Sequence, residues 1–223
     1  MRYITKKDEE LIKTINLIFN FPVNSEKILI ELKKNYKKNT DDPEAAFSFG
    51  FYNFLITSRV KNSTIGSERI ELIFEAYNDA LRIAPDYWLV WMFKAILLLA
   101  LPEVMRDEDE LVRILEKLIS NQKMAEKQQP YFIVPYIIYA DYKFSCNNPD
   151  GALKLIEEAR QNIIKKPIGF KYLNDYFSMP FKDFLKRLVR SNERTLAQMI
   201  MELGREFFPD DIAFNQSIEK EWL

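Results

Sequence analysis

Residues 148–160 read NPDGALKLIEEAR, and this stretch decides the fold class. Asparagine followed by proline is typical of a helix start, because the Asn148 side chain can cap the first turn and proline fits the first helical position. Within that helix, Ala152, Ile156 and Ala159 share one face. Small residues let a neighbouring helix approach closely, and the larger residue fills the space beside them. The stretch therefore predicts one helix of a closely packed pair.

The same spacing occurs in two other stretches of the chain. One contains Ile73, Tyr77 and Ala80 with Pro85 after them, and the other contains Ala197, Met201 and Gly204 with Pro209 after them. Proline ends each helix before the next begins. Helical periodicity predicts further helices with short connections, and no convincing set of strands appears. The predicted helices span about 5–20, 25–38, 43–60, 66–85, 87–101, 107–125, 130–145, 149–164, 180–190, 192–207 and 211–222. The predicted fold class is all-α, with antiparallel hairpins built from about 10–12 helices.

This spacing resembles the second half of the tetratricopeptide repeat (TPR), in which W-x2-L-G-x2-Y precedes A-x3-F and a closing proline. Three sets of residues resemble the first half of the pattern. Phe49-Gly50 resembles its L-G pair, Trp91, Ala95 and Leu98 resemble its W, G and Y positions, and Tyr136, Tyr139 and Ala140 resemble its W, L and G positions. The hairpin at 136–164 matches best, whereas the linker Lys61–Gly66 lengthens the first repeat and the hairpin at 102–129 barely matches. Some other helical bundle or repeat is the alternative.

The resemblance covers roughly residues 43–209 and implies a short solenoid of stacked hairpins. Residues 1–40 would form an extra N-terminal helix pair, and residues 211–223 a terminal capping helix, which stacked repeats need. We therefore expect a single domain spanning residues 1–223.

Composition narrows the possible classes of protein. The chain is 48% hydrophobic with only 5 Gly, which disfavours a turn-rich β fold. Its net charge of −1 predicts no global attraction to nucleic acid. One cysteine, Cys146, excludes an internal disulfide and predicts a cytoplasmic location; we expect this thiol to be buried or half-buried. The apolar stretch Tyr87–Leu101 is too short for a membrane span, which needs about 20 residues, and predicts a buried helix instead.

The residues for common enzyme chemistry are missing. The sequence has no histidine, which excludes Ser-His-Asp and Cys-His catalysis and histidine-bound metals. It has neither of the common phosphate-binding loops. Acidic clusters occur at Asp41-Asp42, at 107–110 and at Asp210-Asp211, where helices are predicted to begin, so we interpret them as helix caps rather than metal ligands. We predict a binding protein that is not an enzyme and has no cofactor, with a carboxylate-based lyase or hydrolase as a minor alternative.

The TPR resemblance implies that the first helices of the hairpins line a concave groove. The residues expected there are Phe47, Phe51, Phe54, Leu89, Met92, Ile96, Val134, Ile137, Asp141 and Phe144. This almost wholly apolar set lacks the Lys, Asn and Arg residues with which some TPR proteins hold a peptide carboxylate. It predicts an adaptor or chaperone-like module that binds an apolar or amphipathic segment of another protein, or a second copy of itself. The alternative is that these side chains simply form the core.

A competing hypothesis is binding to nucleic acid or another polyanion. Nine basic and three acidic residues lie between Arg160 and Arg194. The candidate anion-binding residues are Lys182, Lys186, Arg187, Arg190 and Arg194, of which four are spaced by four and would line one side of a continuous helix. Tyr172, Tyr176 and Phe177 are near enough in sequence to stack on bases. The alternative is a solvated helix face, or pairing with an acidic half of the chain.

Overall fold

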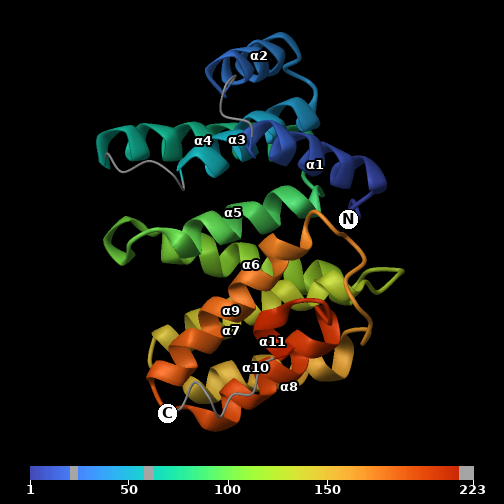
Figure 1. Ribbon diagram of the computed structural model, residues 1–223, viewed down its shortest axis with the longest axis vertical. Helices are drawn as coiled ribbons and strands as arrows, with labels where there is room; N and C mark the ends of the chain where they lie inside the picture. Colours follow the sequence, from blue (N-terminus) through green and yellow to red (C-terminus); the bar gives the residue numbers. More distant parts are fainter. Residues whose placement is uncertain (21–24, 58–62, 216–223) are drawn as a thin grey trace. The chain divides into compact units, whose positions relative to one another are not determined.

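The computed structural model describes residues 1–20, 25–57 and 63–215 (Figure 1). Within these ranges the chain forms eleven α-helices and no β-strand, so the predicted all-α class is confirmed. None of the helices in the described ranges is long and apolar enough to cross a membrane. The chain divides into two compact units, Met1–Leu101 and Pro102–Leu223, and the single domain spanning residues 1–223 stays a prediction. We describe each unit by itself.

Unit 1 contains α1 (Lys6–Asn20), α2 (Ser25–Lys38), α3 (Pro43–Thr57), α4 (Ser63–Ile83) and α5 (Trp88–Ala100). Its closest pairing is between α3 and α4. A Cβ atom at Gly50 of α3 would lie 2.7 Å from Cε1 of Tyr77 in α4, so the missing side chain allows this approach. Ile73, Tyr77 and Ala80 are fully buried. The small-and-large spacing therefore forms a packing face, as the sequence predicted.

Aromatic rings fill the interior of unit 1. The ring of Phe47 lies within 6.0 Å, between centroids, of the rings of Phe51, Tyr77, Tyr87 and Phe93. These rings come from α3, from α4, from the residue before α5 and from α5 itself. Burying side chains of this size supplies most of the driving force for packing the helices together.

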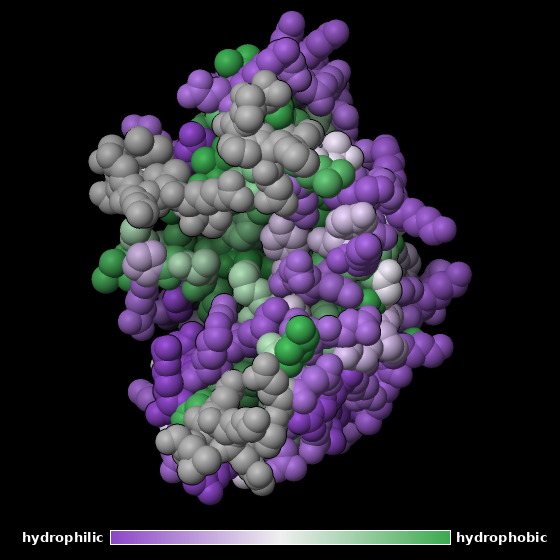
Figure 2. Space-filling model, viewed as in Figure 1, coloured by the Kyte–Doolittle hydropathy of each residue, from purple (hydrophilic) through white to green (hydrophobic). Residues whose placement is uncertain are grey.

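The second helix of unit 1 contributes much less to this core. Every side chain of α2 that the structure describes is at least partly exposed, and Ile30 is among the most exposed apolar residues described. The surface around α2 is mostly hydrophilic in the view of Figure 2. Tyr36 anchors the helix, because its ring stacks on Phe49 and its hydroxyl donates to Asp79 at 2.6 Å.

Unit 2 contains two short 3-10 helices, η2 (Glu103–Met105) and η3 (Pro130–Phe132), together with six α-helices. These are α6 (Glu108–Lys123), α7 (Ile133–Ser145), α8 (Pro149–Asn162), α9 (Asn174–Arg190), α10 (Arg194–Phe207) and α11 (Ile212–Asn215). Its closest pairing is between α7 and α8, which lie in the region of the hairpin predicted at 136–164. Ala152, Ile156 and Ala159 are fully buried, as predicted from the sequence of residues 148–160. The predicted terminal helix is described as far as Asn215, and the rest of it lies outside the described residues.

The predicted helix caps are present. Thr5 and Asp8 form a reciprocal capping box at α1, in which the Thr5 amide donates to Asp8 at 2.8 Å and the Asp8 amide donates to the Thr5 hydroxyl at 3.3 Å. Asp42, Asp107 and Asp211 each accept a backbone N–H from the start of the following helix. The three acidic clusters thus supply caps, and the described residues contain no group of acidic or sulfur side chains able to hold a metal ion.

The predicted boundaries of α9 were wrong at its start. This helix begins at Asn174 rather than near residue 180, and Pro180 lies inside it. The sequence placed the helix start near residue 180, whereas Pro180 lies almost two turns into the helix. Phe177 and Phe181 on either side are fully buried, and their packing offsets the backbone hydrogen bond that proline cannot donate.

Candidate functional site

The predicted groove residues lie mostly in the interior. Eight of the ten are buried, and Phe54 and Phe144 are half-buried. In unit 1 the rings of Phe51 and Phe54 both contact Phe93, and in unit 2 the ring of Phe144 contacts Phe184. These placements correspond to the alternative in which the side chains form the core. They do not provide an open apolar wall, because the chain's own side chains already cover them.

Asp141, one of the predicted groove residues, forms an ion pair with a residue of the predicted anion-binding set. Asp141 of α7 is 2% exposed, and its Oδ1 accepts a hydrogen bond from Nε of Arg187 in α9 at 2.7 Å. Burial raises the pKa of the Asp141 carboxyl, and the Arg187 charge only partly opposes that effect. Two residues assigned by the sequence to competing sites thus form one ion pair between helices.

The predicted row of basic side chains is not continuous. α9 ends at Arg190, and Asn192 adopts a left-handed backbone with φ of 58° before α10 begins at Arg194. The four residues spaced by four would line one side only of a continuous helix, and the break between α9 and α10, which the sequence predicted near residue 191, separates Arg194 from the other three.

Three of the basic side chains are held in ion pairs. Lys182 pairs with Asp211 at 2.9 Å, Lys186 pairs with Asp183 at 3.3 Å, and Arg187 pairs with Asp141. Of the nearby aromatic residues, Phe177 is buried and Tyr172 and Tyr176 are half-buried. Much of the positive charge is thus balanced within unit 2.

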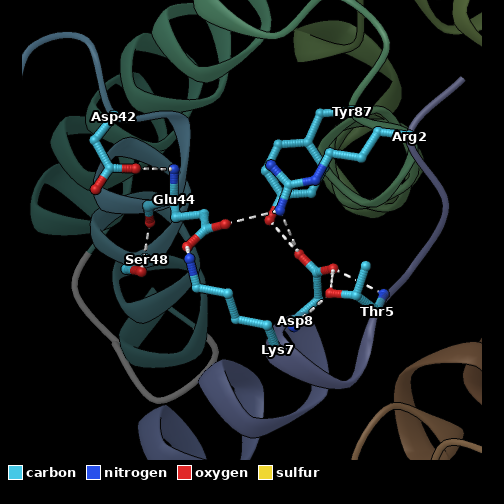
Figure 3. A network of polar contacts seen from close by, with 8 residues as sticks. All are labelled: Arg2, Thr5, Lys7, Asp8, Asp42, Glu44, Ser48 and Tyr87. Carbon is cyan, nitrogen blue, oxygen red and sulfur yellow. Dashed lines mark hydrogen bonds and ion pairs between the residues drawn. The ribbon is translucent and has the colours of Figure 1, made fainter.

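A polar network joins the N-terminal segment to α1, α3 and the residue before α5 (Figure 3). Its centre is Asp8, which is 1% exposed. One carboxylate oxygen of Asp8 accepts from Arg2 at 3.0 Å and from the Tyr87 hydroxyl at 2.6 Å. The other accepts from the amide and hydroxyl groups of Thr5. Arg2 also lies 3.7 Å from the centre of the Tyr87 ring and bonds Glu44 of α3 at 2.9 Å.

This network is a structural clamp rather than a ligand site. Both oxygens of the buried Asp8 carboxylate are occupied by donors from the chain itself. Burial and the neighbouring Asp8 charge raise the pKa of Tyr87, which therefore stays protonated and remains a donor. A buried charge that is fully hydrogen-bonded fixes the position of the elements it joins.

The clearest open site in unit 2 is a cavity of about 510 Å³ at the ends of α6 and α8. We call it the Glu158 pocket, and its lining residues are Gln122, Lys123, Gln128, Tyr136, Glu158, Asn162 and Ile163. They come from the last turn of α6, the connection after it, α7, and the last turns of α8 with the residue that follows. The pocket thus lies where three helices and one loop converge.

Glu158 is the acidic residue in the lining of this pocket. Its Oε1 atom lies 2.6 Å from Nζ of Lys123 and accepts a 3.3 Å hydrogen bond from the Tyr136 hydroxyl. Burial, together with the Glu158 charge, raises the pKa of Tyr136, so this hydroxyl remains a donor at neutral pH. The Lys123 side chain is 52% exposed and the Glu158 side chain 28%. The ion pair therefore lies at the edge of the pocket, where water screens it.

The side-chain amides of Gln128 and Asn162 each use their nitrogen in a hydrogen bond to the backbone, which leaves their oxygens as acceptors. Nε2 of Gln128 donates to the backbone oxygen of Gln122, and Nδ2 of Asn162 donates to the backbone oxygen of Glu158, both at 2.9 Å. Only the nitrogen end of a side-chain amide can donate to a backbone oxygen, so these bonds fix the orientation of both amides. Within the described part of the chain, no hydrogen bond is made to Oε1 of Gln128, Oδ1 of Asn162 or Oε2 of Glu158. The pocket is thus rich in acceptors.

A second cavity, of about 590 Å³, lies at the connection between α8 and α9 and includes Pro167, Asn174 and Phe208. Its acidic residues are at helix starts, and Asp211 among them already caps α11 and pairs with Lys182. We therefore regard the Glu158 pocket as the better candidate.

Among the lining residues, the sequence alone points only to Tyr136, which resembles the tryptophan position of a repeat. Glu158, Lys123 and the amide residues carry no local signal, because each is an ordinary polar residue near a helix end. Cys146, expected to be buried or half-buried, is exposed just after α7. No protein-family model, curated protein or solved structure matches this chain.

Proposed function

We propose that this chain is a protein-interaction module, and that unit 2 holds a segment of a partner protein at the Glu158 pocket. The observation that carries the proposal is the convergence of polar side chains from α6, α7 and α8 around an open cavity that holds a partly exposed carboxylate. Sites that bind peptides and small ligands typically combine such a cavity with a few polar groups that fix orientation.

The resemblance to TPR hairpins supports a binding role of this kind. The α7–α8 hairpin is the best match to that repeat, and it contributes Tyr136, Glu158 and Asn162 to the pocket. Proteins built from stacked helical hairpins commonly use the surface of the stack to bind other proteins.

The partner segment proposed here is polar rather than apolar. An apolar segment would need accessible phenylalanine, leucine and methionine side chains, and most of the predicted ones are buried. The pocket instead offers oxygen acceptors with a small apolar component from Tyr136 and Ile163. We do not propose binding to a polyanion, since Lys182, Lys186 and Arg187 already pair with carboxylates.

A peptide array probed with the purified full-length chain tests the proposal. The array should present short peptides of all compositions, and binding peptides should be titrated in solution against the wild type and Glu158→Gln. The substitution keeps the shape of the side chain and removes its charge, so we expect binding to weaken about tenfold or more. Glu157→Gln is the matched control, because Glu157 is the exposed neighbour outside the pocket lining.

The expected result is a set of peptides whose affinity falls with Glu158→Gln and not with Glu157→Gln. Amide chemical-shift changes on titration should then lie in α6, α7 and α8. An array without binders, or with binders equally affected by both substitutions, would contradict the proposed role of the pocket.

A further inference from the structure

We infer that the Glu158 pocket binds a guanidinium group, as found on an arginine side chain, by displacing Lys123 from Glu158. The proposed function supplies the source of this group, a partner protein, and the inference rests on the proposed function in that respect alone.

Hydrogen-bond acceptors outnumber available donors in the amide and carboxylate groups of the pocket. The amide nitrogens of Gln128 and Asn162 are committed to backbone carbonyls, whereas their oxygens have no partner among the residues that the structure describes. Oε2 of Glu158 likewise has no partner among the described residues, since Lys123 and Tyr136 both bond to Oε1. Three residues thus retain acceptors, and the pocket suits a ligand that brings several donors.

The charge of the pocket depends on two of its lining residues. The Tyr136 hydroxyl is neutral and donates to Glu158, which leaves Glu158 and Lys123 as the only charged groups in the lining that the structure describes. Lys123 is half-exposed, and one ion pair at such a site contributes little, so its ammonium group is free to turn into water. Once it does, the pocket carries one negative charge and selects a cation.

A guanidinium group matches these acceptors better than an ammonium group does. A guanidinium group presents five N–H donors in one plane, and it forms paired hydrogen bonds with a carboxylate. An ammonium group is a compact, strongly hydrated charge. Acceptors that belong to separate residues, one from the loop and two from α8, match a group whose donors spread in several directions. Tyr136 and Ile163 add apolar surface for the methylene chain of arginine.

A two-dimensional NMR titration of the full-length chain tests the inference with defined probes. The probes are methylguanidinium, the peptide Ac-Gly-Arg-Gly-NH2, and the same peptide with lysine or with citrulline, which keeps the shape of arginine but is neutral. We expect the arginine peptide to bind at least fivefold more tightly than the lysine peptide and the citrulline peptide to bind least, because only the charged group forms strong bonds to Glu158.

Two substitutions with opposite expected effects sharpen the test. Glu158→Gln should weaken binding of the arginine peptide about tenfold or more, whereas Lys123→Gln should strengthen it about twofold to fivefold by removing the competing ammonium group. Glu157→Gln should change nothing. A merely general attraction of acidic protein surface for cations would respond equally to Glu158→Gln and Glu157→Gln.

The outcomes separate this inference from the proposed function. Binding of methylguanidinium and the arginine peptide with the expected responses supports the inference, and binding of methylguanidinium alone supports it while assigning the site to a small molecule rather than a partner protein. Peptides from the array that bind through Glu158 without arginine would support the proposed function and overturn the inference. Equal affinity for arginine and citrulline peptides, weaker binding by Lys123→Gln, or no binding of any probe would also overturn it.

Discussion

The hydroxyl group of Tyr87 donates a hydrogen bond of 2.6 Å to Oδ1 of Asp8, although 79 positions of sequence separate the two residues. This contact joins the first turn of α1 to the residue before α5 within unit 1. Because Asp8 is almost completely buried, each of its donors lowers the cost of placing a charge away from water. We therefore expect the stability of unit 1 to be sensitive to the loss of the Tyr87 hydroxyl group.

Replacing Tyr87 with Phe removes this donor and leaves the ring in place. We expect the free energy of unfolding to fall by about 1–3 kcal/mol, the usual cost when a buried polar group loses a partner. Urea unfolding followed by circular dichroism measures it. Tyr139→Phe is the control, since its hydroxyl bonds to the exposed Glu116 at 3.1 Å, and we expect a smaller loss there. Equal losses in the two variants would show that burial of Asp8 is not what makes the Tyr87 contact important.

Gly50→Ala tests the close approach of α3 and α4. The added Cβ would lie 2.7 Å from Cε1 of Tyr77, and that ring is fully buried and cannot move into solvent. We expect a loss of about 1–3 kcal/mol in unfolding free energy from overpacking. In contrast, the added Cβ of Gly66→Ala in α4 meets no atom of the described residues within 4 Å, and this variant should stabilise the protein by about 0.5–1 kcal/mol because alanine favours helix over glycine. Thermal unfolding of both variants gives the comparison, and a Gly50→Ala protein as stable as the wild type would refute it.

The contributions of Asp141 and Asp211 to the stability of the protein should change in opposite directions as pH rises. Burial raises the pKa of Asp141 above its unfolded value of 3.8, so the folded state holds this proton more tightly. The contribution of Asp141 to stability is then greatest below that value and is lost as pH rises through the folded pKa. The pKa of Asp211 is lowered by hydrogen bonds from Lys182, Ala213 and Ser178, which outweigh burial. Its contribution is present above 3.8 and is lost as pH falls through the folded pKa.

The two Asp→Asn variants measure this difference. The stability of the wild type minus that of Asp141→Asn should decrease between about pH 3 and pH 7, and the same difference for Asp211→Asn should increase. Urea unfolding at several pH values for the three proteins is sufficient, because effects of other groups cancel in the differences. Differences that change in the same direction with pH would contradict the opposite pKa shifts.

Cys146 should react readily in the folded protein. Its side chain is exposed after the end of α7, so folding gives it little protection from a thiol reagent. We expect the rate of reaction with a disulfide reagent to differ less than about tenfold between native conditions and urea. Cys146→Ser should change the unfolding free energy by no more than about 0.5 kcal/mol, as for other exposed positions. A native thiol that reacts only after unfolding would contradict the exposure seen here.

Most of the helices could be predicted from the sequence because their signals are local. The capping box of Thr5 and Asp8, the Asn148-Pro149 start and the prolines after helices involve residues within a few positions of one another. The prediction for the start of α9 was wrong because that start depends on contacts between residues distant in sequence. Pro180 has a local preference for the first turn, and packing of distant residues against Phe177 and Phe181 overrides that preference.

The candidate site could not be predicted in the same way. Apolar residues at first-helix positions have the same pattern whether they line a groove or form a core, and only burial separates the two. The basic residues around Arg187 likewise resemble an anion-binding face until their partners are known. Asp141 lies 46 positions from Arg187, and no local pattern connects them.

The sequence by itself determined the all-α class, the positions of most helices and the faces on which small residues allow close packing, since these depend on dihedral preferences and on periodicity along the chain. Only the tertiary structure decided which side chains are buried, which charges neutralise one another and which polar atoms remain without a partner. Those outcomes depend on distances between helices that are remote in sequence. Glu158 became a candidate because folding places Lys123 and Tyr136 beside one of its oxygen atoms and leaves the other unbonded among the residues described.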